Sequence, residues 1–443
     1  MKIENTLYRD TGSSPAQKPL SGAGLIAVTT LGNALEFFDF TVFTFLSLTI
    51  GRLFFPTASP YGQLLLSSGT FVVGYFCRPL GGLLIGLYAD RAGRKAGMTL
   101  TVSLMALSSG LIGIAPTYAT IGVLAPCLIL LSRVMQGISA GGEVGASTAL
   151  LIEYAPPHAR GFYGSWQFAS QGLGSAAGAL LSTVLFRVLS ADAMITWGWR
   201  VPFLVGMLIG PVGYYIRRRV VETLHADATD QRGDSAKAGG LRLLARENLK
   251  PLLLGILLTF GGTSANFIIL FSVPMMASRT LGIPESDAVL AGIATGLTGI
   301  IAGPLGGWVS DRVGRKPVIF CSRLAVILLI APALMWLFHA PSVVRLLVVE
   351  IGLSGCAAFG GATAIGFLPE LFPQRVRATG MAVVYSVGVA FSGLSAQLVA
   401  SWQIGMNHDS MPAAVYVIVC LVLSCLALPG IREPVGRVLG DFH

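Results

Sequence analysis

The segment Gly86-Leu-Tyr-Ala-Asp90-Arg-Ala-Gly-Arg94-Lys95 recurs in the second half of the chain as Gly307-Trp-Val-Ser-Asp311-Arg-Val-Gly-Arg315-Lys316. Every matched position is 221 residues further on, which is half of the 443-residue chain. A second repeat follows each copy, because Glu153 stands seven residues before Arg160 and Glu370 stands seven before Arg377. This spacing indicates two copies of one structural unit.

The residues around these segments are too apolar for a water-soluble protein. Hydrophobic residues make up 53% of the chain, charged residues make up 12%, and the mean hydropathy is +0.73. A soluble domain carries about 25% charged residues, so the composition excludes an ordinary cytosolic enzyme, a disordered protein and a nucleic-acid-binding protein. The 55 glycines fit helices that approach one another closely in a bilayer. We therefore expect an integral membrane protein.

Twelve apolar stretches are long enough to cross a membrane, which takes about 20 residues as a helix. They are residues 24–54, 62–89, 97–116, 121–151, 162–188, 198–216, 251–278, 287–309, 317–338, 342–367, 378–401 and 412–430. One long polar segment follows the sixth stretch. The predicted organisation is an N-terminal tail (1–23), a six-helix bundle (24–216), a linker (217–250), a second six-helix bundle (251–430) and a C-terminal tail (431–443).

The predicted fold is thus an all-α integral membrane protein of 12 transmembrane helices in two pseudo-symmetric bundles. Repeats of the same orientation are typical of secondary transporters, whose substrate site lies near the bilayer midplane between the halves. Of the 30 Lys and Arg residues, 22 fall in segments on the side of the termini, 5 on the other side and 3 within the stretches. Positive residues concentrate in cytoplasmic loops, so we expect both termini to be cytoplasmic.

The repeated charged residues are expected to form a cytoplasmic gate. An Asp at this corner can cap a helix of the other half and pair with its Arg, and the Glu–Arg pairs can close across the two-fold axis when the protein is open to the outside. The alternative is that these charges only set topology and turns. The predicted gate residues are Asp90, Arg91, Arg94, Glu153, Arg160, Asp311, Arg312, Arg315, Glu370 and Arg377.

Together with Arg133-x-x-Gln136-Gly137, the two repeated loops resemble the motifs of the major facilitator superfamily. Within it, the chain resembles the metabolite:proton symporter branch. The residues that carry this resemblance are Gly32-Asn-x-x-Glu36-Phe-Phe-Asp39-Phe40, Arg78-Pro-Leu-Gly-Gly82, Gln136-Gly-x-Ser-Ala-Gly-Gly-Glu143, Gly161-Phe-Tyr163 and Trp197-Gly-Trp-Arg-x-Pro-Phe203. The segment Gly161-Phe-Tyr-Gly-Ser-Trp-Gln167-x-Ala-Ser-Gln171 is similar to citrate and tricarballylate symporters. The resemblance implies the major facilitator fold and location in the plasma (inner) membrane.

Charged side chains also occur inside the predicted spans, where each costs about 2.5–3.5 kcal/mol. At about 1.5 Å of rise per residue, Glu36, Asp39 and Arg78 lie at similar depths, some 18–22 Å from the cytoplasmic edge. Arg133, Gln136 and Glu143 share one face of the fourth stretch, and Gln167 and Gln171 share one face of the fifth. These residues predict a polar cluster at mid-membrane.

The cluster suggests recognition of an anion, because the Arg guanidinium matches a carboxylate in a bidentate manner. Protonation of a buried acid would release its Arg to bind the substrate, so proton and anion would bind together. The predicted proton-coupling residues are Asp39, Glu36, Glu143 and Arg133, with Asp39 and Arg133 as the central pair. The predicted substrate-binding residues are Arg78, Arg133, Gln136, Gln167, Gln171 and Asn266.

Structural roles remain open for several of these residues. Glu36 and Arg78 can form a buried pair that only fixes helix packing, Arg133 and Gln136 can tie two helices together, and the glutamines can act as interhelical hydrogen-bonding groups.

The second half is poorer in buried charge, since Asn266 and Ile269 stand where the first half has Glu36 and Asp39. We therefore expect coupling to reside in the N-terminal half, and structural roles for Arg345 and Glu350. Related symporters commonly carry Phe-Tyr and Tyr-x-Pro in this helix, whereas this chain has Asn266-Phe267 and Ser272-Val-Pro274. This departure leaves the substrate open.

The leading functional prediction is secondary active uptake of a small organic anion with protons, of the di- or tricarboxylate class that includes citrate. The alternatives are symport of a zwitterion or an aromatic acid, such as a betaine, proline or shikimate-like compound, and, behind these, drug/proton antiport. We expect no enzymatic activity, no cofactor and no metal site, because no catalytic, nucleotide-binding or metal-ligating pattern is present. The expected partners are the anion, the proton and the lipid bilayer, with no nucleic acid, and the expected state is a monomer.

Overall fold

The structure is a computed structural model that describes residues 22–56, 60–217, 248–405, 411–431 and 433. Nearly all of the predicted tails (1–23 and 431–443) and of the predicted linker (217–250) lies outside the described residues. The described residues form helices and connecting turns, with no strand among them. The prediction of an all-α fold is therefore confirmed.

Long helices occupy each of the twelve predicted stretches. The first six are α1 (Gly22–Phe54), α2 (Pro60–Ala92), α3 (Arg94–Ile114), α5 (Leu124–Tyr154), α6 (Arg160–Val188) and α8 (Val201–Arg217). The second six are α10 (Leu249–Phe267) with its continuation, α12 (Glu285–Val313), α13 (Arg315–His339), α14 (Val343–Phe367), α15 (Arg377–Gly405) and α16 (Met411–Ala427). Eleven described spans are long and apolar enough to cross a membrane, and α8, with 17 described residues, is the shorter twelfth.

Several short elements join or extend these helices. A five-residue π-helix, η3 (Ile268–Ser272), joins α10 to α11 (Val273–Arg279) within the seventh span. The others are α4 (Tyr118–Ile121), α7 (Ala191–Thr196), η1 (Gly198–Arg200), η4 (Leu368–Leu371), η5 (Gln374–Val376) and η6 (Leu428–Gly430). A π-helix adds a residue to a helical turn and is frequent at functional sites, and apolar periodicity does not reveal it.

The two repeated loops have the same backbone conformation. Gly93 has φ 105° and Gly314 has φ 100°, and each is the N-cap of the helix that follows it. A side chain at either position would meet the steric restriction that keeps other residues out of this region. The sequence repeat is thus also a repeat in structure.

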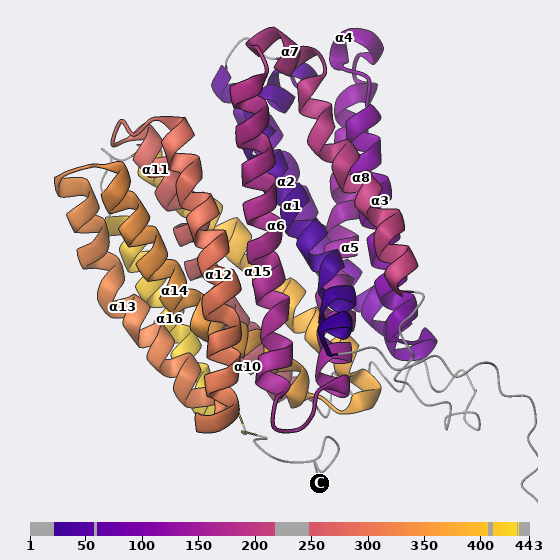
Figure 1. The fold of residues 1–443 in the computed structure, drawn as a ribbon, viewed down its shortest axis with the longest axis vertical. Helices are drawn as coiled ribbons and strands as arrows, with labels where there is room; N and C mark the ends of the chain where they lie inside the picture. Colours follow the sequence, from indigo (N-terminus) through magenta and orange to yellow (C-terminus); the bar gives the residue numbers. More distant parts are fainter. Residues whose placement is uncertain (1–21, 57–59, 218–247, 406–410, 432, 434–443) are drawn as a thin grey trace, which may run out of the picture.

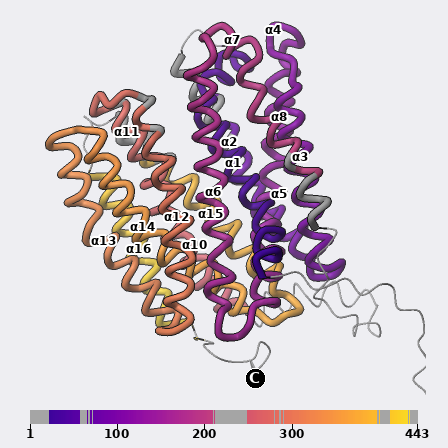
Figure 2. The backbone as a smooth tube through the Cα atoms, viewed as in Figure 1, coloured from indigo at the N-terminus to yellow at the C-terminus, as the bar shows by residue number. Residues whose placement is uncertain are grey.

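The helices form two groups that touch along part of their length. Figure 1 shows α1–α8 in indigo to magenta on one side and most of α10–α16 in salmon to yellow on the other, with α15 passing behind α6. The closest packing between the groups joins α6 to α12 and α2 to α15. Figure 2 shows the groups approaching each other at the end where α1 begins and separating toward α4, α7 and α11.

Each group has its own apolar core, and many large apolar side chains face outward. Phe43, Leu46 and Trp199 belong to the core of the first group, and Ile330 and Leu346 belong to that of the second. On the outside, side chains such as Phe76 and Ile301 are 65% exposed. An apolar exterior around packed helices is the surface expected of a protein that lies in lipid.

Candidate functional site

Glu36 of α1 and Arg78 of α2 form an ion pair inside the first bundle. Arg78 Nη2 donates to Glu36 Oε1 at 2.8 Å, and both side chains are buried. The guanidinium also lies over the rings of Phe40 and Tyr75, at 4.8 and 4.9 Å from the ring centroids. The depth calculation from sequence placed Glu36 and Arg78 at one level, and the structure brings them into contact.

Asp39 is the centre of a second buried cluster, one helical turn further along α1. Its carboxylate accepts hydrogen bonds from Ser109 Oγ at 2.5 Å and from Gln136 Nε2 at 2.6 Å. Arg133 Nη1 lies 3.7 Å from Asp39 Oδ2, and its guanidinium lies over the Phe43 ring at 3.6 Å. The predicted pair of Asp39 and Arg133 is therefore an ion pair in the structure, although Ser109 and Gln136 lie closer to the carboxylate.

Glu143 of α5 is buried and accepts a hydrogen bond from Thr101 Oγ1 of α3. It lies close enough to Glu36 for the two charges to interact. The first bundle thus buries three carboxylates near one another. Two of them form ion pairs with arginines, Arg78 and Arg133.

A hydrogen bond joins the two bundles at the level of these charges. Gln171 Nε2 of α6 donates to the hydroxyl oxygen of Tyr385 on α15 at 3.0 Å. Tyr385 lies within electrostatic range of Glu36 and Arg78, and Tyr75 packs edge-on against Phe267 of α10. Sequence analysis did not identify Tyr385, although a tyrosine within an apolar span was available as an indication.

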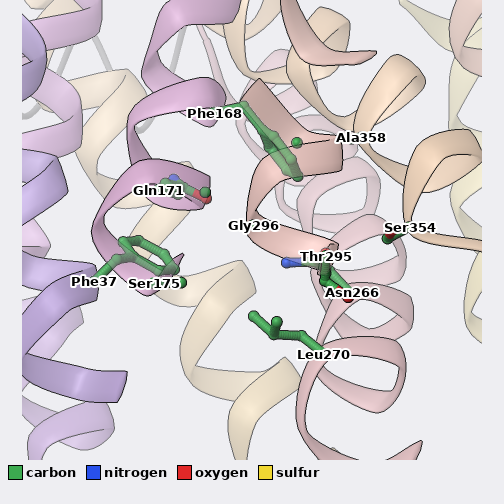
Figure 3. Close-up of a pocket in the computed structure, with 12 residues that line it drawn as sticks. Phe37, Phe168, Gln171, Ser175, Asn266, Leu270, Thr295, Gly296, Ser354 and Ala358 are labelled. Carbon is green, nitrogen blue, oxygen red and sulfur yellow. The ribbon is translucent and has the colours of Figure 1, made fainter. Parts of the chain in front are cut away.

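A partly open pocket lies between the two bundles. The first bundle contributes residues of α1 and α6, and the second contributes residues of α10, η3, α12 and α14. The lining residues are Phe37, Phe168, Gln171, Gly172, Ser175, Asn266, Leu270, Thr295, Gly296, Gly299, Ser354 and Ala358. Figure 3 shows Gln171 and Asn266 on opposite sides of the open space. Its polar groups are amides and hydroxyls, with no charged side chain among these lining residues.

Two of the six predicted binding residues, Gln171 and Asn266, line this pocket. Arg78, Arg133 and Gln136 do not, because their side chains are engaged with the carboxylates described above. The buried Gln167 lies outside the lining too, and its backbone oxygen accepts a hydrogen bond from Asn33 at 2.7 Å. Helical spacing placed Gln167 on the face of Gln171, but only Gln171 reaches the opening.

Two buried charged residues of the second bundle, Glu350 and Arg323, form no ion pair with any described residue. Glu350 of α14 is fully buried, and its Oε2 accepts a hydrogen bond from Thr295 Oγ1 of α12 at 2.9 Å. Arg323 of α13 donates to the backbone oxygen of Leu258 at 3.0 Å. Asn266 stands at the position of the repeat that corresponds to Glu36. It is neutral, and it lines the pocket.

The repeated loops cap helices of the opposite bundle. Asp90 of α2 accepts hydrogen bonds from the backbone amides of Ala378 and Thr379, at 3.2 and 2.8 Å, in the first turn of α15. Asp311 of α12 accepts hydrogen bonds from the amides of Gly161 and Phe162, both at 2.8 Å, in the first turn of α6. Carboxylates stabilise helix N-termini, so each bundle holds the other by the same contact.

Arginines complete these contacts. Arg94 pairs with Asp90 and donates to Glu153 at 3.1 Å, while Arg377 donates to the same Glu153 oxygen at 3.0 Å from the other bundle. In the second copy, Arg315 pairs with Asp311 at 2.6 Å and Glu370 at 3.3 Å.

The other three predicted gate residues lie around these pairs. Arg160 lies within electrostatic range of Glu370. Arg91 and Arg312 are exposed, and the Arg312 guanidinium stacks on Trp308. The contacts anticipated for the gate are thus present, and its role in transport stays a prediction.

The chain is similar to known proteins in sequence and in fold. The model of the Major Facilitator Superfamily matches residues 29–396 and 255–437. A citrate-proton symporter of Salmonella typhi is 34% identical over 383 residues, which cover 86% of this chain and 88% of the relative. A proline/betaine transporter of Salmonella typhimurium is 31% identical over 424 residues, covering 94% and 84%.

Among solved structures, a proton:xylose symporter bound to 6-bromo-6-deoxy-D-glucose superimposes with a TM-score of 0.78. The match covers 94% of this chain and 97% of that chain, at 18% sequence identity. At this identity the likeness concerns the fold alone.

Proposed function

Because the chain belongs to the Major Facilitator Superfamily, we propose that this membrane transporter takes up a small organic anion together with protons by alternating access. The observation that carries the proposal is the pair of buried carboxylate–arginine contacts, Glu36–Arg78 and Asp39–Arg133, beside the pocket between the bundles. Buried charges persist in a membrane where they pair and do work.

Protons and anions are coupled through these pairs in the following way. A proton on Asp39 or Glu36 neutralises the carboxylate and leaves its arginine without a counter-charge. An anion then restores neutrality, so each ligand raises the affinity for the other. Glu143, buried near Glu36, is a further proton carrier in this scheme.

Arg78 is well placed to reach the substrate. Its guanidinium is held by Phe40 and Tyr75, and Tyr385 links this region to Gln171 in the pocket wall. Once Glu36 is neutral, the planar guanidinium offers two parallel N–H groups to a carboxylate. Arg78, Arg133, Gln136, Gln167, Gln171 and Asn266 accordingly remain the proposed binding residues.

A di- or tricarboxylate such as citrate is the proposed substrate class. The likeness to the citrate-proton symporter supports it, as does the supply of two buried arginines.

A zwitterion such as a betaine or proline is the second candidate, because the pocket lining is polar and carries no charged residue. The proline/betaine transporter, 31% identical, supports this candidate. An aromatic acid would find Phe37 and Phe168 in the lining. Drug/proton antiport ranks below these, since a promiscuous pocket would be more apolar.

The proposed orientation places both termini in the cytoplasm, the bundles at 24–216 and 251–430, and the protein in the inner membrane as a monomer. The capping contacts of Asp90 and Asp311 then lie on the cytoplasmic side, and the separated helix ends lie outside. This arrangement corresponds to an outward-facing state that is held by the gate. Loss of the contacts around Glu153 and Glu370 releases the inward-facing state.

The test is uptake by proteoliposomes with an imposed pH gradient, acidic outside, and a panel of labelled citrate, tricarballylate, 2-oxoglutarate, shikimate and betaine. We expect accumulation of citrate or tricarballylate that vanishes when a protonophore collapses the gradient. Accumulation of betaine alone selects the zwitterion candidate. Accumulation that is indifferent to the gradient contradicts proton coupling.

A further inference from the structure

Glu350 of α14 is an acid buried in the second bundle, where the sequence suggested a structural role. It is 0% exposed, and it forms no ion pair with any described residue. Its Oε2 accepts the hydrogen bond from Thr295, and its Oε1 has no hydrogen-bond partner among the described residues. An isolated ionised carboxylate is very costly in an apolar interior, so such a group binds a proton readily.

Among the described side chains, none brings a charge to Glu350. α14 packs most extensively against α12, α13, α6 and α10, and less extensively against η3, η4, α11 and α5. From α12 the group that reaches Glu350 is the Thr295 hydroxyl, and no charged described side chain acts on it. Two arginines of these helices are engaged elsewhere: Arg323 of α13 binds the Leu258 oxygen, and Arg345, near the start of α14, binds the Trp336 oxygen at 3.1 Å.

Thr295 connects this acid to the pocket. Its side chain belongs to the pocket lining, together with Ser354 one turn along α14 from Glu350. Figure 3 shows Thr295 and Asn266 on the same side of the pocket, opposite Gln171. A threonine hydroxyl has one proton to donate and two lone pairs that accept. The direction of the hydrogen bond to Glu350 therefore decides whether the hydroxyl offers a donor or only lone pairs to the pocket.

We propose that Glu350 is a second proton-binding group and that Thr295 transmits its protonation state to the substrate pocket. When Glu350 is ionised, Thr295 donates its proton to Oε2 and presents only lone pairs to the pocket. When a proton from water binds the carboxylate, the new O–H donates to the Thr295 oxygen. The Thr295 proton is then free to point into the pocket and to bind an anion.

The inference rests on the proposed function and adds to it. It places a proton-linked recognition point in the second bundle, opposite Gln171 and apart from Asp39 and Arg133. Glu350 acts here as a positioning residue, and Thr295 makes the contact. Proton binding at Glu350 raises the affinity of the pocket for an anion, so anion affinity rises as the pH falls. Release of the anion returns the proton to water.

Four variants of the full chain separate this role from packing. Glu350→Gln keeps the size of the side chain, and its amide N–H can donate to Thr295 as the neutral acid does. Thr295→Val removes the hydroxyl at equal volume, and Thr295→Ser keeps it. Asp192→Asn makes the same acid-to-amide change at an exposed site on α7 and serves as the control.

Infrared difference spectroscopy across a pH series provides a readout that needs no substrate. We expect a protonated-carboxyl band that Glu350→Gln lacks, that Thr295→Val shifts, and that Thr295→Ser and Asp192→Asn leave in place. A Glu350→Gln spectrum with every wild-type carboxyl band overturns the proposal. The same holds for a band that Thr295→Val leaves unshifted.

Binding of labelled citrate, with betaine as the second probe, tests the link to the pocket. We expect Thr295→Val to weaken citrate binding about tenfold at low pH and Thr295→Ser less than about twofold. In Glu350→Gln, we expect about one fewer proton to bind with each anion, so the slope of log Kd against pH decreases by about one. Equal behaviour of Thr295→Val and Thr295→Ser overturns the link. If neither probe binds the wild type, the proposed substrate class fails, while the infrared bands still decide the role of Glu350.

Discussion

The carboxylate of Glu153 on α5 binds the guanidinium of Arg377 on α15 at 3.0 Å, an ion pair that joins the two bundles. The same Glu153 oxygen accepts a hydrogen bond from Arg94 of its own bundle at 3.1 Å. Asp90, the partner of Arg94, caps the helix that Arg377 begins. Glu153 therefore connects Arg94, which belongs to the repeated loop of the first bundle, to Arg377 at the start of α15 in the second bundle.

Replacing Glu153 with Gln is expected to loosen this end of the interface. Two arginines lose their common counter-charge, and breaking one side of a buried ion pair destabilises by about 3 kcal/mol when nothing replaces it. We predict faster amide hydrogen exchange in residues 374–380, measured by mass spectrometry. Asp192→Asn should leave this exchange unchanged, and equal exchange in both variants would contradict a closing role for Glu153.

Replacing Asp39 with Asn is expected to separate transport from the proton gradient. The variant keeps the size of the side chain next to Ser109 and Gln136, but its amide has one acceptor oxygen where the carboxylate has two, and it cannot take up a proton. We predict at least about a tenfold loss of uptake driven by a pH gradient, with counterflow exchange at equal pH retained.

Ser109→Ala is the milder control for Asp39→Asn, because it removes one hydrogen-bond donor to the Asp39 carboxylate and leaves the carboxylate itself. It should retain gradient-driven uptake. If Asp39→Asn accumulates substrate as the wild type does, Asp39 is not the coupling acid.

Replacing Tyr385 with Phe tests the hydrogen bond between the bundles beside the pocket. The change leaves the Gln171 amide buried without the acceptor that it has at 3.0 Å, a loss of about 1–2 kcal/mol. We predict about a fivefold to thirtyfold increase in KM for uptake.

Tyr416→Phe provides the matched comparison, because the Tyr416 hydroxyl pairs with Ser395 at 2.6 Å and lies outside the pocket lining. The same change in KM for both variants would argue against a contribution of Tyr385 to binding.

The sequence was sufficient to predict the fold, but it was less informative about the site. Hydropathy and the 221-residue repeat predicted every long helix, and the repeat also paired Asp90 with the opposite bundle. The depth of a residue along its helix, however, does not show which neighbouring helix its side chain faces. For that reason the sequence did not distinguish Gln171, which lines the pocket, from Gln167, which does not, and it did not indicate the contact of Tyr385 with Gln171 or that of Glu350 with Thr295.

Replacing Gly93 with Ala is expected to destabilise the repeated loop. Its φ of 105° lies in a region that costs residues other than glycine about 1–3 kcal/mol. We predict a lower unfolding temperature for Gly93→Ala, and likewise for Gly314→Ala, whose φ is 100°.

Gly352→Ala is the control for the loop glycines, because Gly352 lies inside α14 with open space where an added Cβ would stand. It should leave the unfolding temperature unchanged or raise it, since Ala favours helix over Gly by about 0.5–1 kcal/mol. Equal unfolding temperatures for Gly93→Ala and Gly352→Ala would show that the loop conformation is not required.

The most direct test of proton-coupled uptake is to record external pH and labelled citrate together in lightly buffered proteoliposomes. Wild-type protein is predicted to make the outside alkaline in step with citrate entry, while Asp39→Asn lets citrate equilibrate without a pH change. Citrate accumulation without proton movement, or accumulation against a gradient by Asp39→Asn, would contradict the account.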